Sequence, residues 1–261
     1  MDMETISRDG TQLAYQRTGE GPAVVLISGA MSTGATVAPL AAALRDRCDV
    51  VVYDRRGRGA SGDTAPYAVA REVEDLAALI EAVGGEAALY GVSSGGALAL
   101  EAAASGLPVR QAAVYEPPFA DFAPSGAEER AAYTENLTRA LAEGRRGDAV
   151  ELFLRLTGME PQMIAGARQS PMWAEMEAIA PSLAHDDAVM GDGLLPRERL
   201  REVSVPVLAV AGAQSPGWLR EAVRAVAEAV PDGTYRTLEG QTHMVDPAVL
   251  APVLADFFTG G

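Results

Sequence analysis

Lysine is absent from this chain of 261 residues, so all 21 of its basic residues are arginine. Without a lysine amine, the chain cannot form a Schiff base, attach pyridoxal phosphate or build a phosphate loop that ends in Gly-Lys-Ser/Thr. The 36 acidic residues leave a net charge of −15. Because a protein that binds nucleic acid or an anionic membrane replaces counterions with its own cations, this charge opposes both kinds of binding. We therefore expect no nucleic-acid partner and no membrane partner.

Cysteine and histidine are also scarce. Cys48 is the only cysteine, which excludes a disulfide within the chain and a cluster of thiolate metal ligands. Its position beside the apolar run Val50–Val52 predicts a packed, unreactive thiol. The two histidines, His185 and His243, lie far apart and belong to no cluster of ligands, so we predict no metal site and no cofactor.

Long hydrophobic runs are missing as well. No uninterrupted apolar stretch approaches the ~18 residues that a membrane helix needs, and the acidic first four residues lack the apolar core of a signal peptide. An apolar fraction of 48% with 22% charged residues is typical of a globular chain. We expect a cytoplasmic protein with one large domain, or a domain with an insertion. A homo-oligomer is compatible with the sequence.

Hydrophobic periodicity predicts alternating strands and helices. Continuous apolar runs, which are typical of strands covered on both faces, occur at Ala23–Ile27, Val50–Tyr53, Ala87–Tyr90, Gln111–Tyr115 and Val205–Ala211. Stretches with helical spacing separate them, notably Val37–Leu44, Arg71–Val83 and Leu98–Ala104. This alternation predicts an α/β fold with a doubly wound, mostly parallel sheet.

One segment interrupts the alternation. Residues 119–196 contain several stretches with helical spacing, punctuated by prolines, and no convincing strand. Strand–helix alternation resumes after this segment. We interpret residues 119–196 as a helical cap inserted into a core domain that is formed by residues 1–118 and 197–261.

The strongest local signal is the pentapeptide Gly91-Val92-Ser93-Ser94-Gly95, which follows an apolar strand and opens a helical stretch. A serine at a sharp turn from strand to helix needs small residues two positions before and after it, because larger ones would make the two elements collide. Only Ser93 has glycine at both offsets. Ser93 is the predicted nucleophile; the alternative is a glycine-rich turn without chemistry, or one that binds phosphate.

A serine hydroxyl needs a base, and the chain has two candidates. His243 comes directly after the last predicted strand, at the edge of the sheet where ligands bind in open α/β folds. His185 lies in the predicted cap, where we expect a packing role or a surface position. His243 is therefore the predicted base.

Taken in order, these motifs resemble the α/β-hydrolase superfamily over nearly the whole chain. Ser93 matches the family nucleophile, and Gly240-Gln241-Thr242-His243 matches its C-terminal Gly-x-x-His loop. The segment Asp54–Ser61 is similar to the family's Asp-x-Arg-Gly-x-Gly-x-Ser segment, and we expect its arginines to be solvated or structural. The resemblance implies an α/β-hydrolase sheet with a helical cap over the active site.

The resemblance also implies an oxyanion hole formed by the backbone N–H groups of Ala30 and Ser94. Members of the family usually have histidine before the glycine of the oxyanion loop, where this chain has Ser28 followed by Gly29. Because the donors are backbone groups, the loss of that histidine need not remove the hole. A simple turn between strand and helix is the alternative for this loop.

The sequence departs most from many relatives at the third member of the catalytic triad, the acid that pairs with the histidine. They carry Asp in a Gly-x-x-Asp pattern after the strand that corresponds to Val205–Ala211, and this chain ends that pattern with Ser215. Glu116 is the predicted acid, because haloalkane dehalogenases and zearalenone-type lactonases of the superfamily take it from the corresponding strand end. Those lactonases also resemble this chain in the Ser-Ser-Gly of the nucleophile turn. Pro117 predicts an extended backbone at Glu116, and Asp246 is the weaker alternative for the acid.

The predicted function is that of a serine hydrolase that cleaves an ester or a lactone of a medium-sized hydrophobic substrate through an acyl-enzyme. Met31, Phe153, Trp173 and Trp218 are the predicted substrate contacts, although packing between cap and core explains any one apolar residue of the cap at least as well. Two other functions remain open: a carbon–carbon bond hydrolase or cofactor-free lyase or cyclase, and a ligand receptor on a hydrolase fold.

Overall fold

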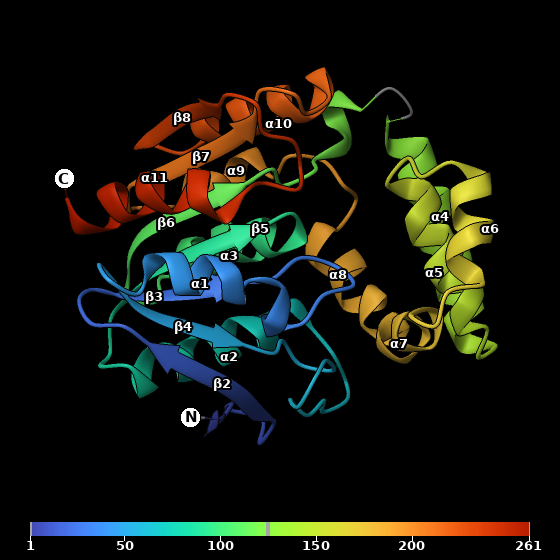
Figure 1. The fold of residues 1–261 in the computed structure, drawn as a ribbon, viewed down its shortest axis with the longest axis horizontal. Coiled ribbons are helices and arrows are strands. Elements are labelled where there is room, and N and C mark those ends of the chain that lie inside the picture. Colours follow the sequence, from blue (N-terminus) through green and yellow to red (C-terminus); the bar gives the residue numbers. More distant parts are fainter. Residues whose placement is uncertain (1, 124–125, 261) are drawn as a thin grey trace.

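The computed structural model describes residues 2–123 and 126–260, and its centre is an eight-stranded sheet with the order β1-β2-β4-β3-β5-β6-β7-β8 (Figure 1). The strands are β1 (Asp2–Ile6), β2 (Gln12–Thr18), β3 (Ala23–Ile27), β4 (Asp49–Tyr53), β5 (Ala87–Val92), β6 (Val109–Tyr115), β7 (Val207–Gly212) and β8 (Gly233–Leu238). β2 runs antiparallel to both of its neighbours, and β3 to β8 are mutually parallel. The predicted α/β class with a mostly parallel sheet is confirmed.

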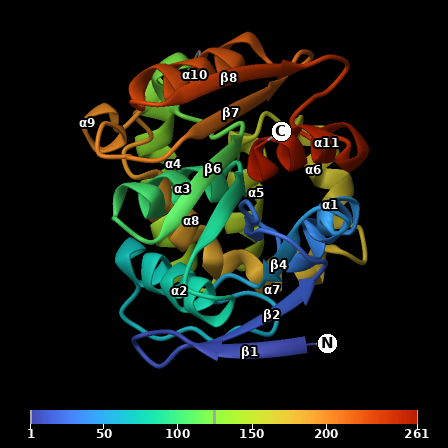
Figure 2. The same ribbon diagram turned by 90° about the vertical axis from the view of Figure 1, so that its left-hand side faces the viewer.

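Helices cover both faces of this sheet (Figure 2). One hydrophobic cluster joins the sheet to α2 (Val69–Ala82), α3 (Ser94–Ala104) and α10 (Gly217–Ala229), and a second joins the opposite face to α1 (Ala38–Leu44) and α11 (Pro247–Thr259). Strand residues alternate between the clusters: Val25 and Ile27 belong to the first, and Val24 and Leu26 to the second. Cys48 is fully buried in the second cluster, and burial raises the pKa of its thiol, as expected for a packed cysteine.

The segment 119–196, which we call the helical insert, has its own hydrophobic cluster beside the sheet. Its described α-helices are α4 (Gly126–Ala142), α5 (Arg146–Leu156), α6 (Pro161–Arg168), α7 (Trp173–Ile179) and α8 (Leu183–Met190). In Figure 1, α4, α5 and α6 stand apart from the sheet, and α8 lies between them and the core. The ends of the insert pack into the core, since Phe119 and Leu195 belong to the first cluster of the sheet. The division at residues 118/119 and 196/197 stays an interpretation.

Over residues 2–123 and 126–260, no helix combines the length and the apolar character needed to cross a membrane.

Candidate active site

Ser93 stands at the sharp turn between β5 and α3. Its backbone has φ +55° and ψ −127°, a conformation that costs a non-glycine residue about 1–3 kcal/mol. The Ser93 N–H donates to the carbonyl of Tyr115, 2.9 Å away, which ties the turn to the end of β6. The side chain of Ser93 is half-buried. The turn therefore presents this serine above the end of the sheet in a strained backbone that the surrounding strands hold.

The glycines on either side of Ser93 are required by close backbone contacts. A Cβ added to Gly91 would lie 2.1 Å from the carbonyl oxygen of Gly95, and one added to Gly95 would lie 2.5 Å from the carbonyl oxygen of Ile27. Real Cβ atoms do not approach backbone oxygens so closely. The structure thus shows the close contacts that require small residues two positions before and after Ser93.

We expect Gly91→Ala to destabilise the protein by about 2 kcal/mol or more, because the methyl group overpacks a junction whose nearest atoms are backbone. Gly166→Ala in α6 is the matched control: no atom lies within 4 Å of its added Cβ, and an alanine inside a helix should stabilise by about 0.5–1 kcal/mol. Urea unfolding of both variants measures the difference. Equal effects of the two substitutions would contradict the packing argument.

Glu116 and His243 meet at the ends of β6 and β8. Glu116 is fully buried, and one of its carboxylate oxygens, Oε2, lies 2.8 Å from Nδ1 of His243. The other oxygen accepts a hydrogen bond of 2.8 Å from the backbone N–H of Gly212, at the end of β7. With the carboxylate ionised, Nδ1 carries the proton and donates to Glu116. The His243 side chain is 41% exposed, so part of the ring remains open to solvent.

The backbone of Glu116 differs from the expectation. Its φ is +49°, in the left-handed region, and the extended conformation predicted from Pro117 is wrong. The N–H of Glu116 still donates to the carbonyl of Val210, 3.2 Å away, so the ladder between β6 and β7 continues to this residue before the chain turns. The two hydrogen bonds of the carboxylate hold a conformation that costs about 1–2 kcal/mol in an ordinary residue.

Two further contacts fix the loop that carries His243. The Tyr115 hydroxyl donates to the carbonyl of Thr242, 2.6 Å away. Gly212 lies so close to this loop that an added Cβ would be 2.4 Å from the carbonyl oxygen of Gln241. The β6 end therefore contacts the Ser93 turn on one side and the His243 loop on the other.

Asp246, the weaker candidate for the acid, and Ser215, at the position where many relatives carry the acid, have different surroundings. Asp246 is the N-cap of α11 and accepts a hydrogen bond of 2.8 Å from the N–H of Ala248. Ser215 is 4% exposed, and its hydroxyl has no hydrogen-bond partner within residues 2–123 and 126–260. The structure brings Glu116 to His243 and engages Asp246 in capping a helix.

The loop after β3 passes beside Ser93. A Cβ added to Gly29 would lie 3.1 Å from the Cβ of Ser93, a tight contact that shows how closely the backbone passes the serine. Ala30 and Met31 follow, half-buried against the hydrophobic cluster of the helical insert. Ser94 begins α3, and the first N–H groups of a helix have no partner within the helix. The roles of the Ala30 and Ser94 N–H groups as oxyanion donors stay a prediction.

The four residues predicted to contact substrate lie on three different parts of the fold. Met31 is in the loop after β3, and Trp218 is half-buried near the start of α10. Phe153 and Trp173 belong to the hydrophobic cluster of the insert, where the Trp173 indole N–H donates to Glu177, 3.0 Å away. Packing thus accounts for Trp173, and substrate contact stays a prediction for all four.

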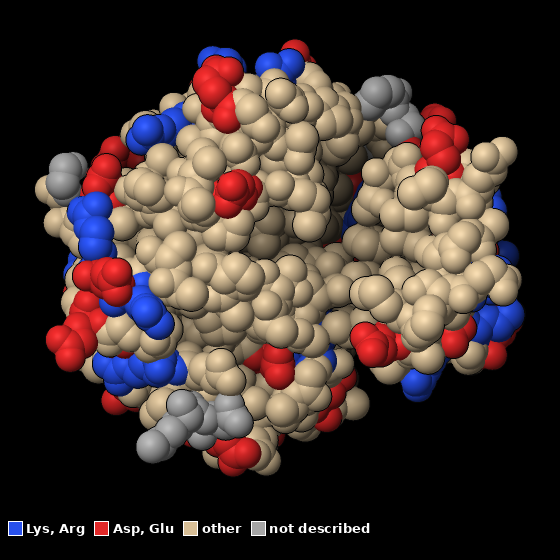
Figure 3. Space-filling view, viewed as in Figure 1, with Lys and Arg blue, Asp and Glu red and all other residues tan. Residues whose placement is uncertain are grey.

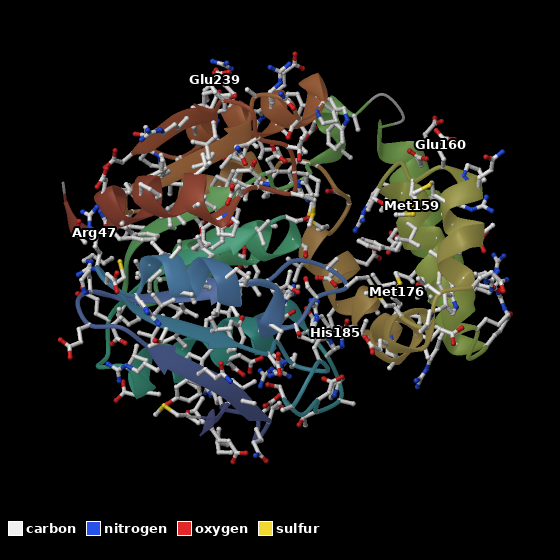
Figure 4. All side chains as sticks on the ribbon, viewed as in Figure 1. Arg47, Met159, Glu160, Met176, His185 and Glu239 are labelled. Carbon is white, nitrogen blue, oxygen red and sulfur yellow. The ribbon has the colours of Figure 1, made fainter. Side chains whose placement is uncertain are left out.

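His185 has the packing role expected of a histidine in the insert. It lies on α8 where the insert meets the core (Figure 4), and its ring stacks on Tyr67 with 3.9 Å between the ring centroids. Burial lowers its pKa, which favours the neutral ring. Its Nε2 is 3.5 Å from an Asp63 oxygen. Over residues 2–123 and 126–260, no three His, Cys, Asp or Glu side chains are grouped to hold a metal ion.

A buried ionic network that was not predicted from the sequence lies behind this site. Arg55, Arg58, Glu72 and Asp186 are each at most 5% exposed. The alternative that arginines of the Asp54–Ser61 segment are solvated is wrong, and they are structural. The similarity of Asp54–Ser61 to the family segment was a signal that Arg55 and Arg58 have a structural role. Asp186, in contrast, comes from α8, and nothing in its local sequence indicates that it pairs with residues of the core.

Comparison with known proteins assigns the fold to a family. The family model described as "Alpha/beta hydrolase family" matches residues 24–253, and the chain belongs to this family. An alpha/beta hydrolase from Sphaerobacter thermophilus is 49% identical, with a TM-score of 0.88 over 98% of this chain and all of that one.

More distant structures share the fold alone. A thermophilic esterase from Thermogutta terrifontis is 22% identical with a TM-score of 0.72, over 100% of this chain and 97% of that one. The enol-lactonase from Burkholderia xenovorans is 23% identical with a TM-score of 0.71, over 98% of this chain and 100% of that one. Among curated proteins, polyketide synthase ThaQ of Burkholderia thailandensis is 40% identical over 96 residues, which are 36% of this chain and 5% of that protein. The chain thus matches only a small part of that curated relative.

Proposed function

We propose that this protein is a serine hydrolase that cleaves a carboxylic ester or lactone through an acyl-enzyme, with Ser93 as nucleophile, His243 as base and Glu116 as acid. The observation that carries the proposal is the hydrogen bond of 2.8 Å between the buried Glu116 carboxylate and Nδ1 of His243. A carboxylate in this position sets the tautomer of the ring and stabilises the imidazolium. The strained serine turn beside it supplies the hydroxyl.

The hydrogen bonds already present in the site determine which atoms take part in the reaction. Because Nδ1 of His243 donates to Glu116, Nε2 is the ring nitrogen that can take the Ser93 proton as Oγ attacks the carbonyl carbon. The backbone N–H groups of Ala30 and Ser94 donate to the tetrahedral oxyanion. His243 then protonates the leaving alkoxide. It next removes a proton from water as the water attacks the acyl carbon, and it returns that proton to Ser93 Oγ as the acid leaves.

The crevice between the core and the helical insert is bordered mostly by uncharged residues in the view of Figure 3, which supports an uncharged substrate. Met159 and Met176 lie on the side of the insert that faces the core (Figure 4), and both pack against the apolar cluster of the insert. In this proposal the insert is a cap that selects a medium-sized apolar acyl or alcohol group. The names of the distant esterase and enol-lactonase agree with this chemistry.

Turnover of p-nitrophenyl esters of increasing acyl length tests the proposal, with a lactone series and a β-diketone series beside it. We expect hydrolysis of esters or lactones with a preference for medium-length acyl groups, and slower turnover of β-diketones. Cleavage of β-diketones alone would replace the proposal with a carbon–carbon hydrolase. Binding of such compounds without turnover would replace it with a receptor.

A further inference from the structure

We propose that Asp186, in α8 of the helical insert, is a positioning residue that holds both donors of the oxyanion hole in place. The inference rests on the proposed function and adds a residue to it. Asp186 lies outside the pentapeptide of the nucleophile turn and outside the loop after β3. Its carboxylate is nevertheless bonded to the first of these segments and, through two arginines, to the second.

The first connection runs to Ser94. The Ser94 hydroxyl donates to Oδ1 of Asp186, 2.8 Å away, and both side chains are buried. The N–H of this same residue is the proposed oxyanion donor from the nucleophile turn. Asp186 therefore anchors Ser94 from the side of the insert. The side chain of Ser94, a residue that does not have glycine at both offsets and is not the predicted nucleophile, acquires a role in positioning.

The second connection runs through Arg58 to the other donor. Arg58 Nη2 donates to Oδ2 of Asp186, 2.7 Å away, and its Nη1 donates to the carbonyl of Gly29, 2.6 Å away. The Gly29 carbonyl and the Ala30 N–H belong to one planar peptide group and point in opposite directions. Fixing the carbonyl therefore fixes the direction of the Ala30 N–H. Asp186 in turn fixes the guanidinium that holds the carbonyl.

Arg55 completes the support. Its Nη1 donates to Oδ1 of Asp186 at 2.8 Å and to the carbonyl of Ser28 at 3.2 Å, and its other two nitrogens form a bidentate pair with Glu72 at 2.7 Å each. The buried guanidinium groups of Arg55 and Arg58 thus face the buried carboxylates of Glu72 and Asp186. Burial alone would raise the pKa of Asp186, but Arg58 and Arg55 outweigh it and lower the pKa, so the carboxylate stays charged.

The arrangement makes the oxyanion hole depend on the insert. Asp186 is the described residue of the insert whose hydrogen bonds reach both Ser94 and the arginines that hold the loop after β3. If α8 moved away, Ser94 would lose its hydrogen bond to Asp186, and Arg58, which holds the Gly29 carbonyl, would lose its carboxylate partner. A displacement of ~1 Å in a catalytic group can cost about 10²-fold in rate. Correct docking of the insert against the core is then required for turnover, in addition to any role of the insert in selecting the substrate.

The test compares Asp186→Asn with Asp187→Asn in the full-length protein. Asp187 is the matched control, because it pairs with Arg130 at 2.6 Å and with Thr134 at 3.1 Å, both on α4, so its loss loosens the insert alone. With p-nitrophenyl butyrate, we expect Asp186→Asn to lower kcat about 10²-fold with KM changed less than about threefold, as for the loss of an oxyanion donor. We expect Asp187→Asn to retain kcat within about twofold, since its partners lie away from the donors.

A trifluoromethyl ketone separates positioning from general damage, because its adduct with the nucleophile places an oxyanion in the hole. Its affinity should fall in Asp186→Asn by about the same factor as kcat. If Asp186→Asn does not fold, Ser94→Ala decides: it keeps the backbone donor, removes the hydroxyl, and should lower kcat and ketone affinity by about threefold to tenfold.

Three results would overturn the inference: a folded Asp186→Asn with the kcat and ketone affinity of the wild type, an equal loss in Asp187→Asn, or, where Ser94→Ala decides, its having no effect. Each would leave ester hydrolysis by the wild type intact, so the proposed function would stand. A wild type that turns over neither esters nor lactones would overturn the proposed function, and this inference with it.

Discussion

Replacing Ser93 with alanine should lower kcat for ester hydrolysis by about 10⁴–10⁶-fold while the protein stays folded. Without the hydroxyl no acyl-enzyme can form, and the remaining activity would come from the oxyanion donors acting on attack by water. Alanine occupies less space than serine and leaves the contacts of Gly91 and Gly95 unchanged. Steady-state kinetics with p-nitrophenyl esters, together with circular dichroism, measures the effect.

Ser94→Ala is the control for this prediction. It removes a hydroxyl one residue away and, on the argument made above for Asp186, should cost about tenfold at most. A folded Ser93→Ala enzyme with activity close to that of the wild type would contradict the assignment of the nucleophile. A loss in Ser94→Ala as large as that expected for Ser93→Ala would shift the assignment to Ser94.

Replacing Glu116 with glutamine should lower kcat by about 10²–10⁴-fold with little change in fold. The amide oxygen can still accept from the Gly212 N–H, but the NH₂ group then faces Nδ1 of His243. That pairing favours the tautomer with the proton on Nε2, which cannot accept the proton of Ser93. The loss of charge also removes the stabilisation of the imidazolium. The measurement is kcat against ester concentration, with thermal unfolding to confirm the fold.

Two variants serve as controls for Glu116→Gln. Ser215→Ala changes the position at which many relatives carry the acid, and Asp246→Asn changes the carboxylate that caps α11. We expect both to retain kcat within about threefold, and Asp246→Asn to cost at most about 1 kcal/mol of stability from the weaker cap. A folded Glu116→Gln with the kcat of the wild type, or a large loss in Asp246→Asn, would contradict the choice of acid.

The parts of the fold that the sequence predicted are those where local pattern and tertiary burial agree. β3 to β7 are central strands covered on both faces, so their apolar runs are continuous and their positions were found within about two residues. α8 was not predicted. It has apolar, acidic and histidine residues without a single apolar face, because it is buried among the core, the insert and the arginines on different sides. The residue pattern of α8 is set by tertiary contacts, which hydrophobic periodicity along the chain does not reveal.

In the candidate site, too, local sequence predicted some features, and long-range contacts determine the others. The glycines around Ser93 follow from a steric rule that local sequence expresses, and the structure shows the short contacts behind it. The pairing of Glu116 with His243 was predicted from the resemblance to relatives that take the acid from the corresponding strand end, together with the place of His243 after the last strand. The left-handed backbone of Glu116 could not be foreseen, because it is held by Gly212 and His243, 96 and 127 residues away in the chain. The hydrogen bond from Ser94 to Asp186 spans 92 residues and belongs to the same class of long-range contact.

Covalent labelling by a fluorophosphonate shows directly whether Ser93 is an activated nucleophile. We expect the intact mass of the wild type and of Ser94→Ala to increase by one phosphonyl group, and the mass of folded Ser93→Ala not to change. Labelling of Ser93→Ala at the rate of the wild type, or no labelling of the wild type, would contradict this role of Ser93.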